Sequence, residues 1–147
     1  MKKKVSVMKA SNPKEAFGSD KLPLHLFPMT ARAWGCIGLL EGALKYGRNN
    51  FRKLGVRSST YYSSVGRHMD LWFEGQDHDP VTQIHHLANA IAGIAILIEA
   101  IEAGNLNDDR NFPGGYIEGK ARLEAKIPFL KRLFAKENPK HYTIGDE

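Results

Sequence analysis

The sequence lacks the features of disulfide-rich, secreted and membrane-spanning proteins. Its single cysteine, Cys36, excludes an internal disulfide, which favours a reducing cytoplasm. No apolar run reaches the roughly 18 residues of a membrane span. No apolar block of signal-peptide length follows the basic start Met1–Lys4. We therefore expect a cytoplasmic chain without a membrane partner, in which Cys36 fills a small space in the core.

Basic residues are scarce in the centre of the chain. From Thr60 to Arg110 the only Lys or Arg residues are Arg67 and Arg110, against eight Asp and Glu residues. The formal net charge of +5 therefore comes from the two ends. This distribution favours a cation-binding centre over nucleic-acid binding. The length of 147 residues, with 42% apolar and 25% charged residues, is typical of one globular domain.

Helical periodicity dominates, and the sequence has no strong strand pattern. Three helices are predicted over residues 31–46, 59–73 and 119–135. Another helix starts with Asp79 as N-cap and Pro80 at its first position, and it ends at Gly104. The sequence thus predicts an all-α fold, a small helical bundle that is completed by oligomerisation. The expected divisions are an irregular leader (1–29), a helical catalytic domain (30–110), and a loop with a basic C-terminal helix or tail (111–147).

Two of these helices carry faces that predict close packing. Gly35, Gly38 and Gly42 follow helical spacing, which indicates close approach by another helix or a ligand. In the helix after Pro80, isoleucine and leucine residues recur over five turns and predict a core-facing stripe. Ala88 lies on a flat second face that could pack on another subunit.

Glu41 is the only charged residue between Trp34 and Leu44. A carboxylate in an apolar helix is costly unless a cation or hydrogen-bond donors meet it. Two interpretations stay open: Glu41 is a metal ligand, or it forms an ion pair with Lys45 four residues further on.

Three carboxylates fall within the six residues from Glu74 to Asp79. Glu74 and Asp77 have a Glu-x-x-Asp spacing, which can place two carboxylates on one divalent cation. They also continue a stripe that begins at Arg67 and Asp70. The alternative is a solvated acidic face with an ion pair inside the helix.

Other polar and aromatic residues could complete a site. His86 is either a ligand or a hydrogen-bonded surface residue. Cations, amides and aromatic rings that could neutralise a triphosphate and stack a base cluster after Glu41 and in the next predicted helix. Taken singly, each is equally consistent with an ordinary loop or interface residue. These substrate-binding candidates are Lys45, Tyr46, Asn50, Arg57, Tyr61, Tyr62, Arg67 and His68.

Many of these residues form an ordered set of motifs. The run from Leu40 to Arg48, followed by Asn50 and Arg52, resembles the signature of the phage and bacterial dATP/dGTP diphosphohydrolase family. The resemblance covers residues 12–110. The later matching positions are residues 55–59, 61–62, 67–68, 72, 74–75, 77, 79–80, 86 and 108–110.

The resemblance implies a relation to the MazG-like all-α nucleoside triphosphate pyrophosphohydrolases, which hold Mg²⁺ with acidic helices. It implies Mg²⁺- or Mn²⁺-dependent conversion of purine deoxynucleoside triphosphates to monophosphate and pyrophosphate, in a bacterium or a phage-infected host. A homodimer or homotetramer is expected. The implied metal ligands are Glu41, Glu74, Asp77, Asp79 and His86. The implied catalytic residues are Glu74, Asp79, Lys45 and Arg67.

One position departs from the family pattern. Gln76 stands where relatives have a glutamate, which would weaken metal binding or change the number of ions. Two alternatives to the enzyme therefore stay open. One is a non-enzymatic helical protein that binds nucleic acid or a phage partner through its basic C-terminal helix. The other is a nucleotide-binding sensor.

Overall fold

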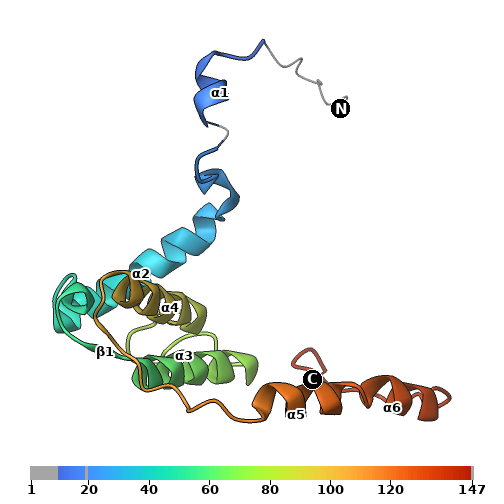
Figure 1. Cartoon of the computed structure of the whole chain (residues 1–147). Helices are drawn as coiled ribbons and strands as arrows, with labels where there is room; N and C mark the ends of the chain where they lie inside the picture. Colours follow the sequence, from blue (N-terminus) through green and yellow to red (C-terminus); the bar gives the residue numbers. More distant parts are fainter. Residues whose placement is uncertain (1–9, 19, 147) are drawn as a thin grey trace.

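Three helices form the core, and two arms extend from it. The computed structural model describes residues 10–18 and 20–146 (Figure 1). The core helices are α2, Met29–Tyr46; α3, Ser58–Phe73; and α4, His86–Glu102. The all-α fold class is confirmed, and the first two predicted helices match within two residues at each end. The shorter elements are α1, Lys14–Gly18; η1, Leu24–Leu26; η2, Asn50–Arg52; β1, Val56–Arg57; β2, Leu106–Asn107; α5, Tyr116–Glu124; and α6, Ile127–Leu133.

Helix α4 is the central element, because α2 and α3 both pack against it and make little contact with each other. A Cβ atom on Gly38 of α2 would lie 2.7 Å from the carbonyl oxygen of Ala88 and 3.0 Å from Cβ of Ala92. The predicted close approach is therefore confirmed at Gly38. It does not extend to Gly42, where a Cβ would meet nothing within 4 Å.

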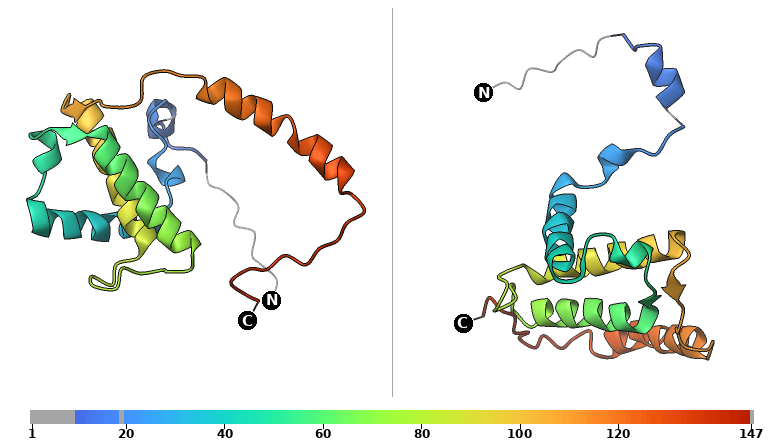
Figure 2. Two further views of the ribbon diagram at one scale, coloured as in Figure 1. Left: turned by 90° about the horizontal axis from the view of Figure 1, so that it is seen from below. Right: turned by 90° about the vertical axis from the view of Figure 1, so that its left-hand side faces the viewer.

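Helices α3 and α4 form an antiparallel pair joined by the loop over residues 74–85 (Figure 2). Gly93 of α4 lies against Val65 of α3, whose Cγ2 would be 2.7 Å from an added Cβ. The far ends of the pair are tied by a two-residue parallel ladder in which Val56 of β1 pairs with Leu106 of β2. This ladder has no counterpart in the sequence-based prediction, because two residues are too few to show an alternating pattern.

The start of α4 differs from the prediction. Residues 80–85 form turns, and α4 begins at His86. Asp79 accepts hydrogen bonds from the backbone N–H groups of Val81 and Thr82, but a left-handed residue, Gln83 with φ 59°, interrupts the chain before a helix can form. The N-cap is His85, whose Nδ1 accepts from the backbone N–H of Leu87 at 3.1 Å.

The buried faces also differ from the prediction. The alanine face of α4, including Ala88 and Ala100, is buried inside the chain and is not free for another subunit. The predicted isoleucine stripe is partly uncovered, with Ile98 56% exposed. Cys36, expected in the core, is exposed on α2. Apolar periodicity identifies one face of a helix, but it does not say whether a neighbour of the same chain covers that face.

The two arms extend away from the core (Figures 1 and 2). Residues 1–9 of the expected leader lie outside the described residues. The predicted C-terminal helix over residues 119–135 was wrong in its extent, because two helices, α5 and α6, meet at Ala125 and Lys126. Pro128 lies in the first turn of α6, where a proline needs no hydrogen-bond donor. Among the described helices, none combines the length and apolar character needed to cross a bilayer.

Candidate functional site

Glu41 is a largely covered carboxylate on α2, with 16% of its side chain exposed. The ammonium group of Lys45, one turn further on, donates a hydrogen bond to Oε1 of Glu41. This hydrogen bond is the main reason why the pKa of Lys45 lies above its ordinary value. The structure therefore shows the ion pair between Glu41 and Lys45. The role of Glu41 as a metal ligand stays a prediction.

Glu41 and Asp79, which lies in the loop after α3, are both within electrostatic range of His68 of α3. Desolvation is the main cause that lowers the pKa of His68, and the neighbouring His86 lowers it further. The negative charges of Glu41 and Asp79 act in the opposite direction, and Asp79 also acts on Lys45. Three separate segments thus bring together Glu41, Lys45, His68 and Asp79, which we call the central cluster.

Asp79 is held rigidly in its turn. Its Oδ1 accepts from the backbone N–H of Thr82 at 2.8 Å, from that of Val81 at 2.9 Å and from Oγ1 of Thr82 at 3.2 Å. The backbone bonds are the main cause that lowers the pKa of this carboxyl group. Within residues 10–18 and 20–146, Oδ2 of Asp79 makes no hydrogen bond, so this charged oxygen is free to accept one.

A chain of hydrogen bonds crosses from α3 through α4 to the loop. Nδ1 of His68 lies 2.9 Å from Nδ1 of His86, and Nε2 of His86 lies 3.0 Å from Oε1 of Gln76. His86 is 1% exposed. Both ring nitrogens of His86 are therefore occupied, and the ring has no free nitrogen for a metal in this conformation. We call Gln76, His86 and His68 the histidine relay.

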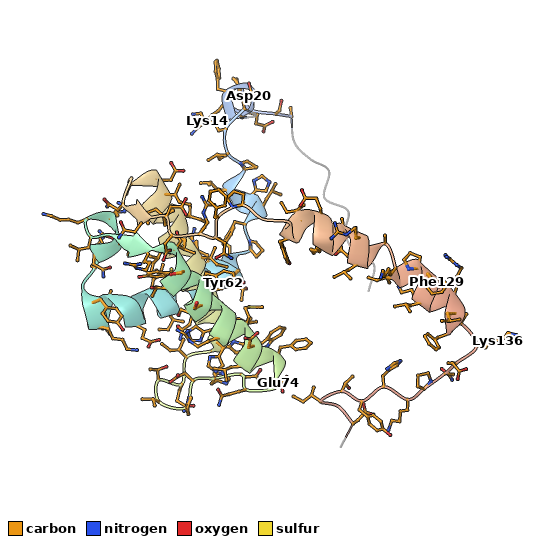
Figure 3. The ribbon with its side chains drawn as sticks, turned by 60° about the horizontal axis from the view of Figure 1, so that its bottom comes forward. Lys14, Asp20, Tyr62, Glu74, Phe129 and Lys136 are labelled. Atoms are coloured by element: carbon orange, nitrogen blue, oxygen red, sulfur yellow. The ribbon has the colours of Figure 1, made fainter. Side chains whose placement is uncertain are left out.

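The other two acidic candidates lie at the edge of this region. Glu74 follows the last residue of α3 and is exposed, beside the returning C-terminal segment (Figure 3). The carboxylate of Asp77 is 62% exposed, with Oδ1 3.8 Å from Nε2 of His85. In the part of the chain that the structure describes, no three His, Cys, Asp or Glu side chains are arranged to hold a metal ion.

The remaining substrate-binding candidates fall into separate places. Tyr61 lies on the side of α3 near Tyr46, and desolvation is the main cause that raises the pKa of its phenol. Asn50 uses its side-chain oxygen to accept from the backbone of Phe51. Arg67 is exposed and borders a shallow hollow of α3, and its positive charge contributes to the lowered pKa of His68. Tyr46 lies within electrostatic range of both Lys45 and Tyr61.

A second polar region surrounds the N-terminus of α3. Asp109 accepts from the backbone N–H of Ser59 at 2.8 Å and from its hydroxyl at 2.5 Å. These bonds are the main cause that lowers the pKa of Asp109, and Arg57, at 3.5 Å, contributes further. The region borders a cavity of about 520 Å³ whose wall includes Tyr62 and Ile101. Arg57 and Tyr62 therefore belong here and not to the central cluster.

Two side-chain contacts were not predicted from the sequence. Asp109 caps a helix that begins 51 residues earlier in the sequence, and no local motif marks such a cap. Gln76 appeared only as a departure from a family pattern, although its amide oxygen is a partner of His86. The 74–85 loop brings the two together by turning back on itself, with a bridge between His78 and His85.

Comparison with known protein families identifies the family of this chain. A profile of the family described as "dATP/dGTP diphosphohydrolase, N-terminal" matches residues 11–110. The chain belongs to this family. The match contains every residue of the central cluster and the histidine relay, and it ends before α5. The resemblance seen in the sequence motifs is therefore confirmed.

A named relative supports the same family. The dATP/dGTP diphosphohydrolase of Salmonella phage PMBT28 is 29% identical over 96 residues, which make up 65% of this chain. The aligned part is 32% of the relative, so the chain spans about a third of the curated diphosphohydrolase that it matches. No solved structure matches the chain.

Proposed function

We propose that this chain hydrolyses purine deoxynucleoside triphosphates, dATP and dGTP, to the monophosphate and pyrophosphate. The observation that carries this proposal is the family match over residues 11–110, which spans all the segments that form the central cluster. The name of the phage relative supports the nucleotide class. The place of action that we propose is the cytoplasm of a bacterium or a phage-infected host.

The central cluster has the chemistry that such a reaction needs. The Lys45 ammonium can offset negative charge that develops on the pyrophosphate leaving group. Asp79 offers a fixed charged oxygen, and Glu41 holds Lys45 in place through their ion pair. Removing a water-derived proton and neutralising the leaving group are separate tasks, and the cluster contains both acceptors and a cation for them.

The proposal includes the predicted requirement for Mg²⁺, with the ion bound together with the substrate. Within residues 10–18 and 20–146, no three His, Cys, Asp or Glu side chains form a group that could bind the ion without the substrate. Mg²⁺ bound to nucleotides usually takes one or two protein carboxylates, while phosphates and waters complete its shell. We therefore propose that Mg²⁺ or Mn²⁺ arrives with the triphosphate. The implied ligands Glu74 and Asp77 stay predictions.

We also propose a homodimer or homotetramer. The buried apolar residues of the described chain are small, namely one valine and four alanines. Large apolar side chains remain uncovered on the core helices, including Leu44 at 80% and Phe73 at 83% exposure. A second copy would remove such surface from water, and burying apolar area is the main driving force of association.

The test uses the purified full chain with Mg²⁺ and a panel of deoxy- and ribonucleoside triphosphates. Pyrophosphate release and chromatography of the nucleotide product identify the bond that is cleaved. We expect dAMP and dGMP with pyrophosphate, and loss of turnover with EDTA. No turnover of any nucleotide by a folded protein would refute the enzyme. Binding without turnover would support a sensor, whereas steeply salt-dependent binding of nucleic acid through α5 and α6 would support a binding protein.

A further inference from the structure

We propose that Gln76 and the buried His86 fix the tautomer of His68, so that His68 presents the lone pair of its Nε2 to a water molecule at the central cluster. Gln76 and His86 are positioning residues in this proposal, and His68 is the residue that contacts the water. The direction of the relay, meaning which ring nitrogen donates in each of its hydrogen bonds, is argued from the geometry of the chain alone. Its use in hydrolysis rests on the proposed function.

The hydrogen-bond partners set the direction of the relay. In the orientation of the Gln76 amide in this structure its oxygen faces Nε2 of His86 at 3.0 Å and can only accept, so Nε2 carries the hydrogen in this contact. A neutral imidazole has one N–H, so Nδ1 of His86 is then an acceptor. The 2.9 Å contact between the two Nδ1 atoms requires Nδ1 of His68 to donate. Nε2 of His68 is left with a lone pair.

The relay depends on a neutral His86. A protonated His86 would donate from both nitrogens and would reverse the contact with His68. His86 is 1% exposed, and its two ring nitrogens face an imidazole and an amide. Asp79 lies within electrostatic range of His86 but forms no hydrogen bond with its ring among the described residues. Placing a charge on that ring would be costly.

Water is the partner that suits Nε2 of His68. Among the described residues this atom has no hydrogen-bond partner, and no buried side-chain nitrogen or oxygen there lacks one, so Nε2 reaches solvent. The oxygens of a triphosphate are acceptors at neutral pH and would be repelled by a lone pair. A water molecule can donate to Nε2, and the negative charge of Asp79 lies within electrostatic range of the same ring.

Nitrogen-15 NMR of histidine-labelled full-length protein at pH 8 tests the relay directly. A ring nitrogen that carries hydrogen and one that carries a lone pair give clearly different shifts. We expect His68 to carry hydrogen on Nδ1 and His86 to carry it on Nε2. Hydrogen on Nε2 of His68 in the unaltered protein would overturn the proposal. His68→Asn and His86→Asn variants supply the resonance assignments.

Substitutions at Gln76 test which residue sets the direction. Gln76→Asn keeps a neutral amide oxygen as acceptor and should preserve the His68 tautomer. Gln76→Lys offers only a donor and should move the hydrogen of His68 to Nε2. Gln76 is exposed, so both changes are compatible with folding. Val81→Lys adds the same charge at a site that is 87% exposed and should leave the tautomer alone. An unchanged tautomer in Gln76→Lys would also overturn the relay.

Kinetics separate the relay from the proposed function. Partners that fix a histidine tautomer typically change activity about 10–100-fold. We expect kcat of Gln76→Lys to be at least about tenfold below that of Gln76→Asn, with a smaller change in KM. Equal kcat values would refute the role in hydrolysis. If the NMR results are as expected but no variant and no unaltered protein releases pyrophosphate, the relay stands and the proposed function fails.

Discussion

Replacing Gly38 by alanine tests the packing that positions α2, and with it Glu41, on α4. The new Cβ would lie 2.7 Å from the backbone oxygen of Ala88, which cannot turn away as a side chain can. Overpacking of this kind costs about 1–3 kcal/mol. Alanine also stabilises a helix by about 1 kcal/mol relative to glycine. The net loss in the free energy of unfolding is therefore expected to be about 0–2 kcal/mol.

Gly42→Ala is the matched control on the same helix. It has the same gain in helix propensity, but its Cβ would meet nothing within 4 Å. We expect Gly42→Ala to be about 1 kcal/mol more stable than the unaltered protein. The difference between the two variants isolates the steric cost, about 1–3 kcal/mol. Urea unfolding followed by circular dichroism, with m-values compared, measures both. Equal midpoints for the two variants would refute the close contact between α2 and α4.

Three further predictions follow from single side chains. Asp109→Asn should lower the melting temperature more than Asp108→Asn, because only Asp109 caps α3. The pKa of Asp109 is lowered in the folded protein, so the loss of stability in Asp109→Asn should be full above about pH 4. The loss should vanish as the pH falls through the lowered pKa of Asp109. A loss of stability that does not depend on pH would contradict this role of Asp109. Lys45→Met should lower kcat/KM for dATP at least about tenfold, whereas the exposed Lys53→Met should not; equal kcat/KM values would contradict the role of Lys45. Cys36 should react with a thiol reagent without denaturant, and a protected thiol would show that a partner covers this face.

The helical fold and its first two core helices were predictable because their signals are local. Apolar spacing and the glycine stripe depend on residues within a few turns, and Gly38 does lie against α4 as expected. The start of α4 was missed because Asp79 and Pro80 look like the first residues of a helix. The same aspartate instead closes an isolated turn, and a left-handed Gln83 follows it.

The candidate site was predictable only in part, for the same reason. The ion pair between Glu41 and Lys45 spans one helical turn, so both residues could be named from spacing. The approach of His68 to Glu41 depends on how α3 packs on α4, which no local pattern encodes. The contacts of Gln76 with His86 and of Asp109 with Ser59 cross 10 and 50 positions. Contacts between residues so far apart in the sequence can be identified only from the three-dimensional structure.

Pyrophosphate release by Glu41→Gln, measured beside Glu102→Gln, tests the central cluster most directly. Both changes remove one carboxylate charge from a helix, but Glu102 lies at the far end of α4. Loss of a preorganised charged group from an active site typically costs about a hundredfold or more in kcat. We expect that loss for Glu41→Gln with dATP and dGTP, and near-normal turnover for Glu102→Gln. Equal turnover by the two folded variants would contradict an active site at the central cluster.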